Sequence, residues 1–303
     1  MRAFRTLISR DIKMFFGDKG LFFTSLVTPL ILLLLFVTFL GNVYRSSFIE
    51  AIPDGTIVPD SLIEGFVGGW LFSSLLAVSC VTVAFCSNLL MVQDKANSSV
   101  SDLTVSPVKE SALSLSYYVS SVIVTLAICA VALIACFIYL AVVGWYLTAA
   151  DMILIFLDVF LLVMFGTALS SVINFFLSTQ GQIAAVGSIV SACYGFICGA
   201  YMPISQFSEG IQKLIMFLPG TYGTGLIRSH MQGGVFEELE KCGIPQQGIE
   251  GMREAFDCTL YFFGNRVSIG AMYAVMGISV LLLVIIYVML NVFKGKGMLR
   301  AKR

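Results

Sequence analysis

The sequence contains six apolar stretches, each about as long as a helix needs, roughly 20 residues, to cross the hydrocarbon core of a bilayer. Because the backbone finds no water in that core, such stretches must be helical. The chain is 58% hydrophobic and 12% charged, whereas a soluble domain is about 45–50% apolar and about 25% charged. The sequence therefore predicts an all-α integral membrane protein with a single membrane domain over residues 1–303. The expected transmembrane helices are 21–41, 66–92, 113–143, 151–177, 182–202 and 267–293.

The distribution of lysine and arginine predicts on which side of the membrane each loop lies, because cytoplasmic loops carry an excess of these residues. Residues 2–19 and residues 294–303 each contain five of them, and the 93–112 loop contains two. The 42–65 loop has one arginine against four acids. Six spans with both termini in the cytoplasm fit this pattern. The long 203–266 segment then lies outside.

Residues 2–19 have the pattern of an amphipathic helix, in which apolar side chains recur at helical spacing between basic ones. Such a helix lies in the headgroup layer, with its apolar face toward the lipid tails and its bases toward anionic lipid. A simple anchor before the first span would have the same pattern. The expected apolar face consists of Phe4, Leu7, Ile8, Ile12 and Phe15.

The longest predicted cytoplasmic connection between spans is the 93–112 loop. It has a short helical pattern at 95–105, which would present Leu103 on one face with charged residues beside it, and Pro107 is a stop signal. A short amphipathic helix of this kind can dock in a groove of a partner protein. An ordinary solvated connection would have the same pattern.

The segment between the fifth and sixth predicted spans is broken by prolines. Pro203 ends one helix, residues 208–218 form about three turns, and Pro219–Gly220 separates them from a second short helix near 224–231. Neither half is long enough to cross a bilayer. We expect a re-entrant helical hairpin in the outer leaflet, a geometry that requires protein or water to satisfy the interrupted backbone.

Asp158 lies about two turns into the fourth predicted span. An aspartate at mid-helix costs roughly 2.5–3.5 kcal/mol on insertion scales, so it is a candidate for a functional intramembrane polar site. It is also close enough to the interface to be solvated there. His230 is the only histidine and the sequence has no H-x-x-x-H pattern, so neither a metal site nor an intramembrane enzyme is predicted.

Two cysteines, Cys242 and Cys258, fall in the segment predicted to lie outside. Paired cysteines outside the cytosol suggest a disulfide. Two free thiols are the alternative.

Three motifs occur in order along the chain. Residues 2–19 come first, DLTVSP follows at 102–107, and the third is Pro203 … Leu218-Pro219-x-Thr221-Tyr222 … Leu226-Ile227-Arg228. Together they resemble the connecting helix, the cytoplasmic motif after the coupling helix, and the signature of the ABC type-2 permeases. These proteins are the membrane subunits of one class of ABC exporter. The resemblance covers essentially the whole chain.

The resemblance implies a permease subunit of an ATP-driven exporter, not an enzyme. The chain has no G-x-x-x-x-G-K-[ST] sequence, so it has no P-loop of its own and no cofactor. ATP and Mg²⁺ would be held by a separate dimer of ABC ATPase subunits. The chain would pair with a second copy of itself or with a related permease, contact membrane lipid, and bind no nucleic acid. It would lie in the plasma membrane, most simply that of a bacterium.

The resemblance also assigns two sets of residues. The set expected to couple to the ATPase is Asp94, Lys95, Val100, Asp102, Leu103, Ser106 and Pro107. The set expected to form the outer gate is Pro203, Pro219, Gly220, Tyr222 and Arg228.

The predicted spans are aliphatic and rich in phenylalanine, with few polar groups. This composition favours a hydrophobic or amphipathic substrate, such as a drug, a lipid or a peptide, moved outward. A polysaccharide or glycolipid path would favour aromatic platforms, and the sequence has two tryptophans but eleven tyrosines. That alternative stays open, as does a non-transporting membrane assembly or sensor protein.

Overall fold

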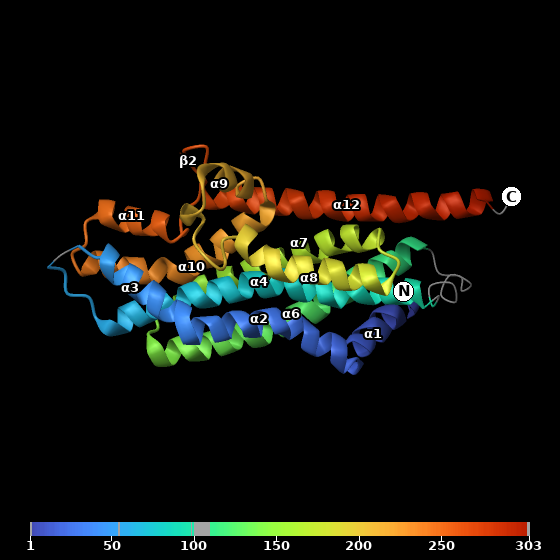
Figure 1. Ribbon diagram of the computed structural model, residues 1–303, viewed down its shortest axis with the longest axis horizontal. Coiled ribbons are helices and arrows are strands. Elements are labelled where there is room, and N and C mark those ends of the chain that lie inside the picture. The colour runs from blue at the N-terminus through green and yellow to red at the C-terminus, as the bar shows by residue number, and fades with distance from the viewer. Residues whose placement is uncertain (1, 54, 98, 100–109, 302–303) are drawn as a thin grey trace.

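The computed structural model describes residues 2–53, 55–97, 99 and 110–301, and these are almost entirely helical (Figure 1). Two short strands form the only sheet among them, an antiparallel hairpin. In chain order the elements are α1 (Arg2–Gly17), α2 (Lys19–Leu35), the π-helix η1 (Phe36–Leu40), α3 (Gly41–Ala51), α4 (Asp60–Ala96), α6 (Glu110–Val143), α7 (Ala149–Phe175), α8 (Gln180–Ile197), the 3₁₀-helix η2 (Ile204–Gln206), α9 (Glu209–Ile215), α10 (Pro219–Lys241), α11 (Gln246–Ala255), β1 (Tyr261–Phe262), β2 (Asn265–Arg266) and α12 (Ile269–Ala301).

The core of the bundle is α4, which lies along the middle of the molecule (Figure 1) and packs against α2, α6, α7, α8 and α10. Its most apolar 18-residue window is 100% buried inside the protein, as expected for a helix that is hydrophobic on every side. The contact with α7 is closest at Gly166, where a Cβ atom would lie 2.9 Å from the carbonyl oxygen of Cys80. Small residues allow helices to approach in this way inside membranes.

Within the described ranges, five helices are long and apolar enough to cross a bilayer, namely Lys19–Ala51, Asp60–Ala96, Ser111–Val143, Ala149–Phe175 and Ile269–Phe293. They correspond to the predicted spans one to four and six. The fifth predicted span is α8, a helix of 18 residues. It ends at Ile197, before Gly199, whose φ of +70° belongs to the left-handed region that commonly terminates helices. The prediction that this span extends to residue 202 was therefore wrong.

The first crossing is also longer than the predicted 21–41, because the helix continues through η1 and α3 to Ala51. Its extension is held by aromatic packing. The Phe48 ring stacks on Phe66 with centroids 3.9 Å apart, and the Tyr44 ring lies 3.9 Å from Trp70. Packing against α4 therefore continues the helix past the end of its apolar run.

The predicted pair of short half-helices is only half correct. α9 has seven residues, as a short half should. α10 has 23 residues, about 34 Å of helix, and does not end near residue 231. It packs against α4, α7 and α12, and nearly all of its residues from Gly220 to Phe236 are buried. Tertiary burial therefore stabilises a helix whose many glycines disfavour it locally.

Both termini lie at one end of the bundle. α1 and the last turns of α12 share this end, which we call the terminal end, and α3 and α11 lie at the opposite, distal end (Figure 1).

Candidate functional site

A groove of about 1250 Å³ lies between α2, α4 and α8. It runs along α2 from Asp18 to Leu40, a path of about 33 Å at the helical rise of 1.5 Å per residue. Most of its lining is aliphatic or aromatic. Polar side chains are sparse: Asp18, Thr24, Thr28, Gln93, Ser188, Ser191 and Tyr201. Pockets of this size and chemistry bind apolar or amphipathic small molecules.

At the terminal end, α1 is joined to α4 and α6 by a charged network that we call the α1 network. Arg10 donates two hydrogen bonds to Asp94, from Nη1 to Oδ2 at 2.8 Å and from Nη2 to Oδ1 at 3.0 Å. Tyr117 also donates to Asp94, and Ser120 donates to the neighbouring Asp11. The Asp94 side chain is only 4% exposed, so this two-pronged pair is stronger than a surface salt bridge.

Electrostatics in the α1 network follow from burial and pairing. The hydrogen bond to Asp94 raises the pKa of Arg10 above its ordinary value, so the guanidinium stays charged. Burial raises the pKa of Asp11 to about 6, although Arg10 opposes the shift. Two acids, Asp11 and Asp94, therefore share one arginine, Arg10.

The predicted apolar face of α1 packs against the protein, not only against lipid. Leu7 is buried with Met91 and Tyr117, and Phe15 is buried with Leu89 and Val92. Phe4, Ile8 and Ile12 are half-buried along the same helix. The predicted helix is confirmed, and its apolar face is an internal contact of the bundle.

The predicted coupling residues are only partly described. Asp94 is buried in the α1 network, and Lys95 donates to the last carbonyl oxygens of α7, those of Asn174 and Phe175, at 3.1 and 3.0 Å. A lysine at a helix C-terminus satisfies free carbonyls and complements the helix dipole. Asp94 and Lys95 thus fix the start of the 93–112 loop to α1 and α7. Val100, Asp102, Leu103, Ser106 and Pro107 lie outside the described residues.

Toward the distal end, Arg228 is the centre of a buried cluster that we call the arginine cluster. Its guanidinium is 1% exposed and bonds Asp257 at 3.3 Å, the hydroxyl of Ser74 at 3.0 Å and the carbonyl oxygen of Gly199 at 2.9 Å. It also lies over the ring of Trp70, 4.6 Å from the centroid. The cluster joins α4, the end of α8, α10 and the loop after α11.

The other predicted gate residues surround the start of α10. Pro219 is its first residue and Tyr222 donates to the carbonyl oxygen of Met216 at 2.6 Å. Gly220 is needed because a Cβ there would lie 2.6 Å from the Tyr194 hydroxyl. Pro203 caps η2. The structure thus places four of these five residues at the α9–α10 turn and the η2 turn, whereas Arg228 lies deeper.

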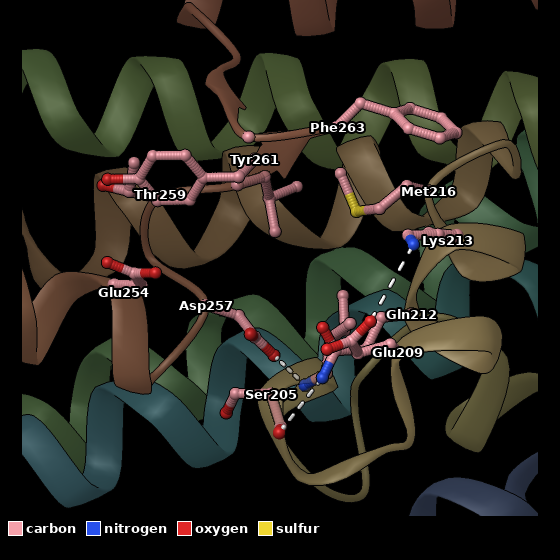
Figure 2. A pocket seen from close by; sticks show the side chains of 13 residues that line it. Ser205, Glu209, Gln212, Lys213, Met216, Glu254, Asp257, Thr259, Tyr261 and Phe263 are labelled. Carbon is pink, nitrogen blue, oxygen red and sulfur yellow. Dashed lines mark hydrogen bonds and ion pairs between the residues drawn. The ribbon is translucent and has the colours of Figure 1, made fainter.

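Asp257 is a residue of the candidate site that sequence reasoning missed. It lies in a pocket of about 340 Å³ between α9 and the hairpin, where its carboxylate accepts a 2.6 Å hydrogen bond from the Ile204 amide. Figure 2 shows this carboxylate pointing toward the turn that carries Ser205, with Tyr261 on the other side of the pocket. Burial raises the pKa of Asp257 to about 6, against the opposing effect of Arg228. No local pattern in the sequence marked this acid.

Asp158 is fully buried and has two partners from other helices. His230 Nδ1 of α10 lies 2.6 Å from Asp158 Oδ2, and Tyr273 of α12 donates to Oδ1. The sequence identified Asp158 and His230 separately, but nothing in it connected them. The triad joins α7, α10 and α12. Asp158 is therefore stabilised by these partners inside the protein, and not by water at the membrane interface.

The structure does not contain the predicted Cys242–Cys258 bridge, and both cysteines are free in it. Cys258 is buried with its thiol directed at the Phe256 carbonyl oxygen, 3.8 Å away. Cys242, by contrast, caps the end of α10. The two residues belong to opposite ends of the α11 excursion.

A polar seam lies in the α4–α7 contact, in the half of α4 that leads to the terminal end. Asn88 donates to the hydroxyls of Ser170 and Ser171 at 3.0 and 2.7 Å. The Thr167 hydroxyl and both polar atoms of the Asn174 side chain are buried and have no hydrogen-bond partner among the residues that the structure describes. Such groups cost free energy where they occur, so this contact is less stable than an apolar one.

Long apolar helices around a buried central helix, with charged clusters inside, define a polytopic membrane protein. A family model described as ABC-2 type transporter matches residues 2–231. The chain therefore belongs to the ABC-2 type transporter family, as its motifs indicated. It is a multi-pass membrane permease of an ABC transporter, and its family implies association with an ABC ATPase. No curated protein matches the sequence.

Proposed function

We propose that the chain is the permease subunit of an exporter that moves a hydrophobic or amphipathic molecule outward along the groove between α2, α4 and α8. The groove carries the proposal, because it is mostly apolar and its length of about 33 Å matches the roughly 30 Å of a bilayer's hydrocarbon core. A second permease copy, identical or related, would cover its open side.

The terminal end would face the cytoplasm of a bacterial cell. The basic residues of 2–19 and 294–303 support this orientation. At the distal side, α9 and the hairpin expose Ile211, Leu214, Phe217 and Phe263. These apolar side chains support insertion of α9 into the outer leaflet, beside the gate.

The power would come from separate ATPase subunits that bind ATP and Mg²⁺. Their closure would push the 93–112 loop. Asp94 and Lys95 lie at the base of that loop, so the motion would reach α1 through Arg10 and α7 through its last carbonyls. The arginine cluster and the α9–α10 turn would form the outer gate.

Two isoleucines of similar exposure test whether the groove is the path. Ile31 lines the groove and is 53% exposed, and Ile134 of α6 is 59% exposed on another face. We expect Ile31→Trp to lower substrate export from reconstituted vesicles at least 10-fold and Ile134→Trp to leave it within about 2-fold, because only the first fills the groove. Equal effects would reject the groove as the path.

The partner and the substrate class need a second experiment. The permease should co-purify with an ABC ATPase, and Leu103→Asp should abolish the stimulation of ATP hydrolysis. Failure to capture an ATPase would favour an assembly or sensor protein. Stimulation by glycan-lipids and by no drug, lipid or peptide would favour the glycolipid exporter.

A further inference from the structure

The described lining of the groove has one charged side chain, and that side chain is an acid at one end. Among the described residues that line it, Asp18 is the only charged one, and the other polar groups are neutral hydroxyls and amides. Lys19 follows Asp18 in the chain, but it does not line the groove. From this asymmetry we infer that the groove selects amphiphiles with a cationic headgroup, which bind at the Asp18 end. The inference rests on the proposed function, since it names the substrate class of the same path.

The Asp18 carboxylate is held in place without being neutralised. It caps α2, accepting a hydrogen bond from the Leu21 amide to Oδ1 at 3.1 Å. The partial positive charge of a helix N-terminus favours a negative charge at this position. Within the described structure no hydrogen bond or ion pair engages Oδ2, and the residue is exposed. Oδ2 is therefore available to a ligand.

The rest of the groove suits the tail of such a molecule. Thr24 and Thr28 follow Asp18 at intervals of six and four residues on α2, and beyond them come Ile31, Leu35 and Phe39. The α2 side of the groove is thus apolar beyond Thr28, and the polar groups that α8 and the segment after it add there, Ser188, Ser191 and Tyr201, are uncharged hydroxyls. A quaternary ammonium at Asp18 would place an alkyl chain along the apolar stretch, whereas a sulfonate there would face a like charge, with no base among the described residues that line the groove.

The test compares three probes with a dodecyl chain and different heads: cationic trimethylammonium, dimethylamine oxide, which is dipolar with no net charge, and anionic sulfonate. Binding of each, below its micellar concentration, is measured to the permease–ATPase complex in nanodiscs. We expect the ammonium probe to bind at least 10-fold tighter than the sulfonate probe. In Asp18→Asn this preference should fall below about 2-fold, while binding of the amine oxide stays unchanged.

Asparagine caps helices as well as aspartate does, so Asp18→Asn removes the charge and keeps the start of α2. Asp18→Ser repeats the test with a second uncharged cap, and Glu240→Gln removes an exposed acid far from the groove. Retention of the ammonium preference in both Asp18 variants, or equal binding of ammonium and sulfonate to the natural protein, would overturn the inference.

ATP hydrolysis and transport are measured in the same samples. If probes bind with the expected preference but none changes ATP hydrolysis or crosses a vesicle membrane, the transport proposal fails and the charge selectivity stands. If the amine oxide is transported and charge makes no difference, only the selectivity fails.

Discussion

Replacing Arg228 by methionine should destabilise the protein by about 3–5 kcal/mol at pH 7.5, the usual cost of removing one partner of a buried ion pair. Methionine fills similar space, so cavity formation contributes little. The change removes the three hydrogen bonds of the guanidinium and leaves Asp257 buried without its ion-pair partner, with the Ile204 amide as a remaining donor.

The loss should depend on pH, because it comes from the carboxylate. The folded-state pKa of Asp257 is about 6, above the ordinary 3.8, so its contribution to stability is fully present below about pH 4 and is lost as the pH rises through 6. That cost is roughly 3 kcal/mol at neutral pH. Without Arg228 the pKa rises further, so the penalty in Arg228→Met grows at pH 7.5 and is relieved at pH 5.

The assay is equilibrium unfolding in mixed detergent micelles at pH 5 and 7.5. Arg228→Met with Asp257→Asn should recover most of the loss at pH 7.5, since no buried charge remains. Arg253→Met is the matched control: its guanidinium also lies 4.6 Å from a ring, that of Phe236, and should cost below about 1 kcal/mol. A loss in Arg228→Met that is equally large at both pH values would refute the reasoning.

Three further changes probe the other polar sites. Asp94→Asn removes the charge that pairs with Arg10 and should cost about 1–2 kcal/mol; it should also lower the number of substrate molecules exported per ATP hydrolysed, and an unchanged ratio would exclude a coupling role. Asn174→Leu removes two unpartnered polar atoms and should raise the free energy of unfolding by about 1 kcal/mol, whereas a loss would show that these atoms have partners. His230→Ala should destabilise by roughly 2 kcal/mol because it removes a hydrogen-bonding partner of buried Asp158, and His230→Asn, whose amide can both donate and accept, should lose less in the same unfolding measurement.

The apolar runs and the order of motifs were enough to predict the membrane class, five of the spans and the family. Local composition carries this information, because the bilayer acts on every residue of a span separately. The ends of helices were less predictable. The extension to Ala51 depends on Tyr44 and Phe48 meeting α4, and no local pattern reveals such contacts.

The sites were harder to predict for the same reason. Arg228 was expected at a gate, yet its partner Asp257 is 29 residues away in the chain and belongs to a loop that the motifs do not cover. Asp158 and His230 are 72 residues apart. A charged residue in an apolar segment indicates that a partner must be present. Which residue is that partner follows only from how the helices pack.

α4 is the one described helix that takes part in both charged clusters. Asp94 belongs to the α1 network and Ser74 to the arginine cluster, and their separation of 20 residues corresponds to about 30 Å of helix. Because α4 is buried along its most apolar window, a push on its C-terminal end would move it as a unit against α7. The polar seam at Asn88 and Asn174 makes that contact less stable than an apolar one. We propose that the same helix carries the displacement of the loop to Arg228. The two costly buried ion pairs, Arg10–Asp94 and Arg228–Asp257, would then be the points at which α4 receives and passes on that motion, at Asp94 and at Ser74.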